Sequence, residues 1–349
     1  MQIYHHIQDF KRLKNAVVTI GTFDGVHLGH QQIIKELVKK SRQNGGESVI
    51  LTFFPHPRMI LNPENHSLKM INTMAEKASI LHRLGIDHLI ITPFTRDFSN
   101  LNPEAYIKQV LIEQIGMKEM VIGYDHRYGK DRSGGLAELK QFSEVYGYSL
   151  TEIAEADVRD IAVSSTRIRT ALNLGDVDTA NDLMGHPFTL SGKVIKGDQI
   201  GRTLGYPTAN LFIEENYKLI PSDGIYAVRV EISEPKNKNQ ELYNPYQPTS
   251  STNLKTESKI YRGMAYIGHR PTINGMSQNI EVNIFDFEGD IYHQNIKMDF
   301  LHFIRNDVKF EGLEKLIEQL GRDKLAALAY FSNKEKLDKT VQSRPVSND

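Results

Sequence analysis

Two histidines, His27 and His30, lie three residues apart in a glycine-containing stretch, residues 21–30, that follows an apolar run and opens a helical pattern. Near a helix start this spacing lets both imidazoles face one bound group, where they can donate hydrogen bonds to phosphoryl oxygens. Backbone N–H groups at a helix start also favour phosphate, and Gly29 lets the backbone approach a ligand closely. A decorated helix cap and a metal site are the simpler interpretations, although a metal would need a third ligand.

Two later segments could add to a phosphate site. Residues 164–169 place hydroxyls at a predicted helix start and two arginines in its first turn. Cations disfavour a helix N-terminus, so the arginines hint at an anionic ligand; taken alone, the segment is more simply an N-cap with surface arginines. Residues 123–129 follow a predicted strand and could close over a bound ring or ribose, but by themselves they indicate only a turn.

A second glycine-rich stretch covers residues 197–210. Its glycines permit a tight phosphate-cradling loop, while Thr208 and Asn210 alternate onto one face of an extended segment. A hydroxyl and an amide oxygen are hard ligands that suit Mg²⁺ bound with phosphates. The simpler interpretation is a glycine-rich hairpin.

A carboxylate could supply the base for a phosphoryl transfer. In residues 280–285 the apolar side chains share one face of a predicted strand, and Glu281 and Asn283 share the other. Glu281 could accept the proton of a hydroxyl that attacks a phosphoryl group. A solvated strand carboxylate is the usual alternative.

The composition excludes several classes of protein. The chain has 349 residues, enough for two domains, and its 42 Lys and Arg residues against 43 Asp and Glu residues argue against a polybasic nucleic-acid arm. The absence of cysteine excludes disulfides, thiolate metal sites and cysteine nucleophiles. No apolar run approaches the length of a membrane span, and the polar N-terminus predicts no secretion signal. Neither Gly-x-x-x-x-Gly-Lys-Ser/Thr nor Gly-x-Gly-x-x-Gly occurs. We therefore expect a cytoplasmic protein.

The order of apolar runs predicts two kinds of fold. Strand-like runs at residues 16–20, 48–53, 88–92, 119–122 and near 148–153 alternate with helical patterns, which indicates an open parallel sheet wrapped by helices. After residue 185, strand-like runs at 190–195, 225–231, 260–267, 280–285 and 296–303 are separated by turns, which indicates a small antiparallel barrel. A helix is expected over residues 312–331. Residues 233–258 suggest a long exposed loop between two barrel strands.

Taken together, these strings resemble the prokaryotic bifunctional riboflavin kinase/FMN adenylyltransferase (FAD synthetase) family. The first string by itself is similar to the signature of the nucleotidyltransferase superfamily. The resemblance runs from Gly21 to about Phe331 and rests on ordered segments at residues 27–30, 164–169, 207–210, 221–227, 268–272, Glu281 and 303–305.

The resemblance implies an N-terminal Rossmann-like nucleotidyltransferase domain (residues 1–184), a six-stranded antiparallel riboflavin kinase barrel with a C-terminal helix (185–332), and a polar, frayed tail (333–349). The kinase would make FMN from riboflavin and ATP with Mg²⁺; the other domain would join FMN to AMP, giving FAD and pyrophosphate. Small-molecule substrates are expected, with no nucleic acid or membrane, and the sequence is compatible with a transient homo-oligomer.

Residue roles follow from the same resemblance. The catalytic residues would be His27, His30 and Glu281. The adenylyltransferase would bind nucleotide through Gly21, Phe23, Asp24, Gly29, Asp125, Ser164, Thr166 and Arg169. The kinase would bind nucleotide through Gly197, Gly201, Arg202, Gly205, Thr208 and Asn210, with Thr208 and Asn210 at the metal and Arg305 at the flavin.

The chain departs from the family pattern at Phe54, at His126 and at Asn306–Asp307, and none of these changes removes an assigned catalytic group. Three other functions remain as alternatives. They are an enzyme with only one of the two activities, a flavin- or nucleotide-binding regulator, and an adenylyltransferase for another substrate. The regulator would not need Glu281, and the last would not explain the kinase motifs.

Overall fold

The structure is a computed structural model that describes residues 1–61, 68–124, 126–153, 163–197, 200–233, 258–272 and 275–342. The chain folds into two compact units. Unit 1 contains the described residues of Met1–Thr166 together with Leu183–Gly185. Unit 2 contains Arg167–Asp182 and the described residues of His186–Gln240 and Leu254–Asp349. Among the described residues, no helix combines the length and the apolar character needed to cross a bilayer.

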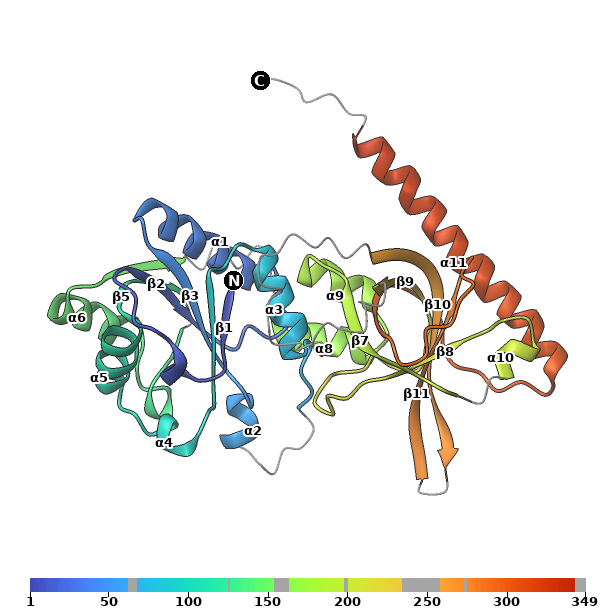
Figure 1. Cartoon of the computed structure of the whole chain (residues 1–349), viewed down its shortest axis with the longest axis horizontal. Helices are drawn as coiled ribbons and strands as arrows, with labels where there is room; N and C mark the ends of the chain where they lie inside the picture. Colours follow the sequence, from blue (N-terminus) through green and yellow to red (C-terminus); the bar gives the residue numbers. More distant parts are fainter. Residues whose placement is uncertain are drawn as a thin grey trace, which may run out of the picture. The chain divides into compact units, whose positions relative to one another are not determined.

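Unit 1 is built on a six-stranded, wholly parallel sheet (Figure 1) with the order β1-β4-β3-β2-β5-β6. From β2 the chain adds β3 and β4 on one side and then β5 and β6 on the other, so the order reverses between β2 and β5. In such sheets ligands bind beyond the carboxyl ends of the strands at that reversal. The strands are β1 (Gln2–Tyr4), β2 (Ala16–Ile20), β3 (Glu47–Phe53), β4 (His88–Thr92), β5 (Met117–Gly123) and β6 (Ser149–Ile153).

Both faces of this sheet are covered. Alternating side chains form one core with α1 and α3 around Val17 and Ile50, and another with η2 and α6 around Val18 and Leu51. The helices of unit 1 are η1 (Ile7–Asp9), α1 (Leu28–Gln43), α2 (Pro57–Leu61), α3 (Met74–Arg83), α4 (Arg96–Ser99), α5 (Pro103–Ala105), the π-helix η2 (Tyr106–Ile115), η3 (Lys130–Arg132) and α6 (Leu136–Tyr146). The chain continues with α8 (Ser165–Asn173) and α9 (Val177–Met184), most of whose residues belong to unit 2.

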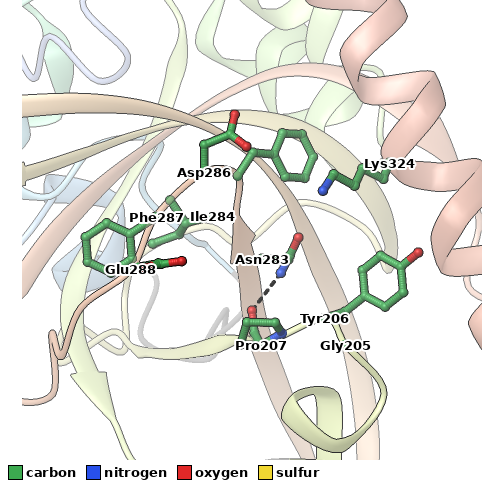
Figure 2. Close-up of a pocket in the computed structure, with 10 residues that line it drawn as sticks. Gly205, Tyr206, Pro207, Asn283, Ile284, Asp286, Phe287, Glu288 and Lys324 are labelled. Carbon is green, nitrogen blue, oxygen red and sulfur yellow. Dashed lines mark hydrogen bonds between the residues drawn. The ribbon is translucent and has the colours of Figure 1, made fainter.

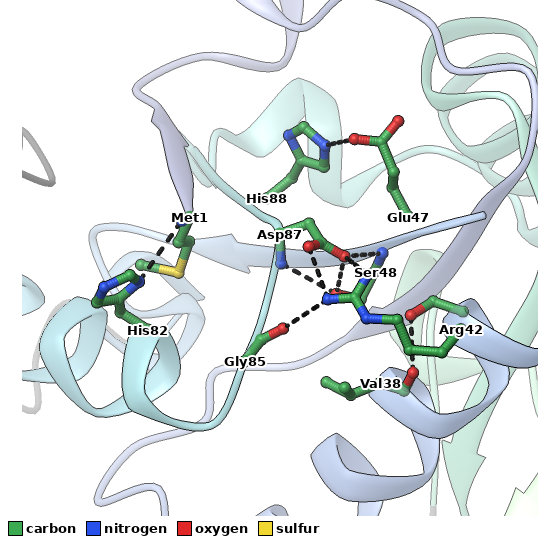
Figure 3. Close-up of polar contacts among 10 residues, drawn as sticks. Met1, Val38, Arg42, Glu47, Ser48, His82, Gly85, Asp87 and His88 are labelled. Carbon is green, nitrogen blue, oxygen red and sulfur yellow. Dashed lines mark hydrogen bonds and ion pairs between the residues drawn. The ribbon is translucent and has the colours of Figure 1, made fainter. Parts of the chain in front are cut away.

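Polar groups at the amino ends of β3 and β4 bond to one another (Figure 3). The guanidinium of Arg42 holds the Asp87 carboxylate at 2.8 and 2.9 Å, and Ser48 donates to the same carboxylate at 2.8 Å. Burial alone would raise the pKa of Asp87, but the hydrogen bonds from Arg42 and Ser48 outweigh it and keep this pKa below its usual value. His88 and Glu47 pair alongside at 2.8 Å. These mutually bonded groups stabilise the edge of the sheet.

Unit 2 is a closed antiparallel barrel with the order β10-β11-β8-β7-β12-β9 (Figure 1). Its strands and helices are β7 (Phe188–Ile195), α10 (Ile200–Thr203), β8 (Ala209–Phe212), β9 (Gly224–Ser233), β10 (Ser258–Thr272), β11 (Gly275–Ile284), β12 (Asn295–Arg305) and α11 (Leu313–Gln342). Ala327 and Phe331 of α11 pack with Ile225, Met264 and Leu301 of the barrel.

The predicted fold class, a parallel α/β sheet followed by a six-stranded antiparallel barrel and a C-terminal helix, is confirmed. The expected end of the helix near Phe331 is wrong, because α11 continues to Gln342. Residues 333–342 contain neither Gly nor Pro and include three Lys, so nothing local stops the helix, and Glu335 forms an ion pair with Arg262. The short strands β1 and β8 were not predicted as separate elements. Residues 234–257, within the predicted loop, lie outside the described residues.

Candidate active sites

The loop between β2 and α1 brings the two predicted histidines together. His27 is the N-cap of α1, and its Nδ1 accepts a hydrogen bond from the backbone N–H of His30 at 3.3 Å. The imidazole rings of His27 and His30 are stacked, with centroids 3.6 Å apart and planes at 16°. The loop follows the carboxyl end of the central strand β2, where the strand order reverses. Two adjacent imidazoles at a helix N-terminus in this position are suited to a phosphate ligand.

The backbone of this loop is unusual. Phe23 and Val26 have positive φ values of 46° and 38°, which cost non-glycine residues about 1–3 kcal/mol each. The buried Phe23 ring packs edge-on against His30 with centroids 5.2 Å apart, and it lies over Gly21, where a Cβ would be 3.0 Å from the ring. Gly29 is buried in the first turn of α1. Phe23 and Gly21 therefore support His30 in this structure.

Burial strongly favours a neutral His30. Burial is the main cause that lowers its pKa well below the ordinary value, and the positive charges of protonated His27 and of Lys77 lower it further. Its Nδ1 is buried and has no hydrogen-bond partner among the described residues. A neutral imidazole donates from one ring nitrogen, and a bound phosphate would raise this pKa.

Asp24, expected at the nucleotide, holds a neighbouring segment in place, and its predicted contact with the nucleotide stays a prediction. Its carboxylate is 1% exposed and accepts hydrogen bonds from the backbone N–H groups of Ile71 at 3.0 Å and Asn72 at 3.4 Å. Ser165, at the start of α8, donates to the Asp24 carbonyl oxygen at 2.9 Å. This bond brings the predicted hydroxyl segment to the β2–α1 loop through Ser165, a member of that segment to which no site role had been assigned.

The roles of the other predicted ligands of this site remain predictions. Ser164 and Thr166 are exposed at the start of α8, and Arg169 is half-buried one turn further along the helix. Asp125 lies outside the described residues. At His126, one of the departures from the family pattern, the imidazole stacks on the Tyr128 ring with centroids 6.0 Å apart.

Buried polar atoms without partners gather near the same edge of the sheet. Thr92 is the last residue of β4, Asn72 precedes α3, and Tyr128 follows β5; the Thr92 Oγ1, Asn72 Oδ1 and Tyr128 hydroxyl lack hydrogen-bond partners among the described residues. Burial raises the pKa of the Tyr128 hydroxyl, so it stays protonated. Orphaned buried groups of this kind often mark a ligand or ordered water. Tyr128 belongs to the segment of residues 123–129 that the sequence analysis considered, whereas neither composition nor motif spacing had indicated Asn72 and Thr92.

In unit 2, Gly197 and Gly201 lie so close to neighbouring polar groups that a larger residue would collide with them. A Cβ at Gly197 would collide with the Asn210 side chain, and one at Gly201 would collide with the Tyr206 carbonyl oxygen. Gly205 has a φ of 80°, which suits glycine. Arg202, predicted at the nucleotide, is exposed in α10.

Glu281 and Thr208 are brought into direct contact. The Thr208 hydroxyl donates to Glu281 Oε2 at 2.8 Å, and Asn279 Nδ2 donates to Oε1 at 2.6 Å. Asn210 lies opposite Glu281 in the β8–β11 register. Because a hydroxyl that donates its proton keeps its oxygen lone pairs, Thr208 can still face a cation, and the carboxylate keeps lone pairs for a third donor.

A cavity of about 530 Å³ is lined by residues that follow or precede this pair in the chain, although Thr208 and Glu281 themselves do not line it (Figure 2). Its lining consists of Gly205, Tyr206 and Pro207, the end of β11 with the residues that follow it (283–288), and Lys324 of α11. Asn283 donates to the Pro207 carbonyl oxygen at 2.7 Å, which fixes the segment leading to Thr208. The size suits a nucleotide.

Arg305, expected at the flavin, is hydrogen-bonded to Asp323, a residue that the sequence analysis did not identify. Its Nε and Nη2 donate to the two carboxylate oxygens of Asp323 at 2.8 and 2.7 Å, and Nη1 donates to the Asn306 carbonyl oxygen. Asp323 is 1% exposed and also accepts from Gln319. This bidentate pair ties the end of β12 to α11.

Mg²⁺ is the cofactor that the hard oxygen donors of Thr208 and Asn210 would suit, together with nucleotide phosphates. Among the residues with described positions, no group of three or more His, Cys, Asp or Glu side chains could hold a metal ion.

The sequence and fold are similar to those of known proteins. The family model of FAD synthetase matches residues 9–167 and that of riboflavin kinase matches residues 184–331. The bifunctional riboflavin kinase/FMN adenylyltransferase of Listeria monocytogenes is 34% identical over 92% of this chain and 94% of its own length. That of Bacillus subtilis is 34% identical over 95% of this chain and 97% of its own length.

A solved structure from Streptococcus pneumoniae, described as a macrolide-efflux protein, has a TM-score of 0.77 and 30% identity, covering 93% of this chain and 97% of that one. The fold is thus shared over almost the whole length of both chains. The family models and the curated relatives agree on the two transferase activities. The chain belongs to the family of bifunctional riboflavin kinases/FMN adenylyltransferases.

Proposed function

We propose that the two activities of the family are divided between the two units, with adenylyl transfer at the His27–His30 loop and riboflavin phosphorylation at Thr208, Asn210 and Glu281. The observation that carries this proposal is that each unit has its own set of groups suited to phosphate chemistry. Unit 1 has stacked imidazoles at a helix start. Unit 2 has a carboxylate bonded to a hydroxyl beside a cavity.

In the kinase step, Glu281 accepts the proton of the riboflavin 5′-hydroxyl as its oxygen bonds to the γ-phosphorus and the bond to ADP breaks. Thr208 and Asn279 orient the carboxylate toward that proton. Mg²⁺, held by Thr208 and Asn210, would neutralise phosphate charge when it is bound. The cavity beside Pro207 receives the nucleotide.

In the adenylyl step, a phosphate oxygen of FMN bonds to the α-phosphorus of ATP and pyrophosphate leaves. His27 and His30 hold the phosphates and stabilise the charge that develops on them. The buried, unpartnered Nδ1 of His30 supports a role at a ligand, because such atoms are otherwise costly. Ser164 and Thr166 of unit 1 would contact the same phosphates, and the role of Arg169, which follows them in α8, stays a prediction.

We place the boundary between the two functional domains at residues 184 and 185, with a first domain of residues 1–184 and a second of 185–332. A fragment of residues 185–349 should fold and phosphorylate riboflavin, because it contains the strands of the barrel and α11 and lacks only the Arg167–Asp182 part of unit 2. An inactive fragment beside an active full-length chain would show that the division is wrong.

The assay that tests the whole proposal supplies either riboflavin or FMN, with ATP and Mg²⁺, and separates the flavins by chromatography. Glu281→Gln should stop FMN formation but still convert supplied FMN to FAD, and His30→Ala should do the reverse. Loss of both activities in either variant would contradict two separate sites.

A further inference from the structure

We infer that Lys77 is a positioning residue for adenylyl transfer, acting through the Thr22 carbonyl group and the Phe23 ring on His30. Lys77 lies in α3, outside every motif that the sequence singled out. This inference rests on the proposed function of His27 and His30.

Lys77 is buried and bonds to the backbone of the β2–α1 loop. The side chain is completely buried, at 0% exposure, and its Nζ donates to the Thr22 carbonyl oxygen at 2.7 Å. Buried lysines are rare unless a partner compensates the charge. Thr52 Oγ1 lies 3.4 Å from the same carbonyl oxygen. The bond fixes the direction of the peptide group immediately before Phe23.

The loop between β2 and α1 has a strained backbone that neighbouring groups must stabilise. Phe23 and Val26 adopt left-handed conformations that such side chains rarely take, and such residues persist where the surrounding structure over-determines them. Asp24 anchors the middle of the loop to the backbone of Ile71 and Asn72, just before α3. Lys77 and Asp24 thus connect the loop to the segment that contains α3 at two points.

The Phe23 ring connects this loop conformation to the imidazoles. Phe23 has a positive φ, and its ring lies against His30, which in turn stacks on His27. A change at the Thr22 carbonyl would turn the Phe23 ring and release His30. Small displacements of positioned groups can lower a rate about 10²-fold.

The titratable groups that face Lys77 are Asp24 from the β2–α1 loop and His30 from α1. Burial is the main cause that lowers the Lys77 pKa, to about 8, and the Asp24 charge opposes this shift. At neutral pH the ammonium is therefore charged and helps to keep His30 neutral.

The test compares Lys77→Met with Arg83→Met, which removes an exposed cation from the same helix. For Lys77→Met we expect the kcat of FMN adenylylation to fall about 10- to 100-fold, with the KM for ATP changed less than fivefold. Riboflavin phosphorylation should stay within twofold of the parent, because it depends on unit 2. In an NMR titration the His30 imidazole pKa should move upward toward its ordinary value. Arg83→Met should change neither activity.

Unchanged adenylylation in Lys77→Met, or a lower melting temperature with unchanged kcat, would overturn the inference. If Lys77→Met does not fold, Thr52→Val probes the same carbonyl; a twofold to fivefold fall in kcat is expected there, and no fall overturns the inference. His30→Ala is measured alongside. If His30→Ala is fully active, the proposed site fails; if only Lys77→Met is fully active, the positioning role alone fails.

Discussion

In unit 1 the stacked histidines rest on a loop fixed by buried groups, whereas in unit 2 the half-buried Glu281 and Thr208 are bonded directly to each other. The β2–α1 loop contains two residues with positive φ, Phe23 and Val26, and hydrogen bonds of Asp24 and Lys77 anchor it. The carboxylate of Glu281 already has two donors and a cavity nearby.

This difference predicts which substitutions should affect each site. In unit 1 the supporting residues are spread over the loop and α3. Substitution of a residue that does not contact the imidazoles should therefore still displace them. In unit 2 the bonds are local, so a substitution that preserves shape should isolate the chemistry of one group.

The largest expected effect is at Glu281. Glu281→Gln retains size and one acceptor oxygen but removes the base, so the kinase rate should fall roughly 10²- to 10⁴-fold while riboflavin binding changes little. Single-turnover phosphorylation and a flavin-binding titration measure the two quantities. A parent rate would mean that the carboxylate is an ordinary strand residue.

The next effect is at His30. Removing the imidazole with His30→Ala should lower FMN adenylylation roughly 10²- to 10³-fold, by analogy with the loss of one oxyanion donor. Pyrophosphate release from ATP and supplied FMN measures it. Kinase activity in the same protein is the control, and an unaltered adenylylation rate would remove His30 from the site.

A smaller effect is expected at the Arg305–Asp323 pair. Asp323→Asn leaves Arg305 without a carboxylate partner and should lower the free energy of unfolding of unit 2 by about 1–3 kcal/mol. Urea unfolding of the purified protein measures this. The matched control is Glu318→Gln, which breaks an exposed pair with Arg322 and should cost less than about 1 kcal/mol. Equal effects would contradict a structural role for the buried pair.

Much of the fold was predictable because hydrophobic periodicity reports burial directly. The runs that became β2, β3, β4 and β5 are dominated by apolar and β-branched residues without a strict alternation, as expected of a parallel sheet buried on both faces. The His27–His30 spacing likewise predicted neighbouring rings, because one helical turn brings them together. Local patterns were sufficient in these cases.

The supporting groups were not predictable, since their roles depend on contacts distant in sequence. Lys77 in α3 resembles an ordinary polar helix residue, yet its partner is Thr22. Asp323 is one acidic residue among several in α11, and only the fold pairs it with Arg305. Asp24 belongs to the predicted motif, but its carboxylate bonds to backbone groups near residue 71. Motif spacing identifies reactive groups better than the groups that hold them.

The smallest expected effect is the pH dependence of unit 1. Burial, with the charges of His27 and Lys77, lowers the His30 pKa, so the unfolded chain binds a proton more readily than the folded one. Stability should therefore fall as pH decreases below the ordinary histidine value of about 6.5, by up to about 1.4 kcal/mol per pH unit. Asp87 has a lowered pKa and acts in a different window, because its contribution is lost only as pH falls below about 4. Urea unfolding of unit 1 between pH 7 and 5, for the parent and His30→Asn, measures the slope. Equal slopes in the two proteins would mean that His30 titrates normally. Burial of the first site would then not influence the protonation of its histidine, and the two sites would differ only in how their side chains are held.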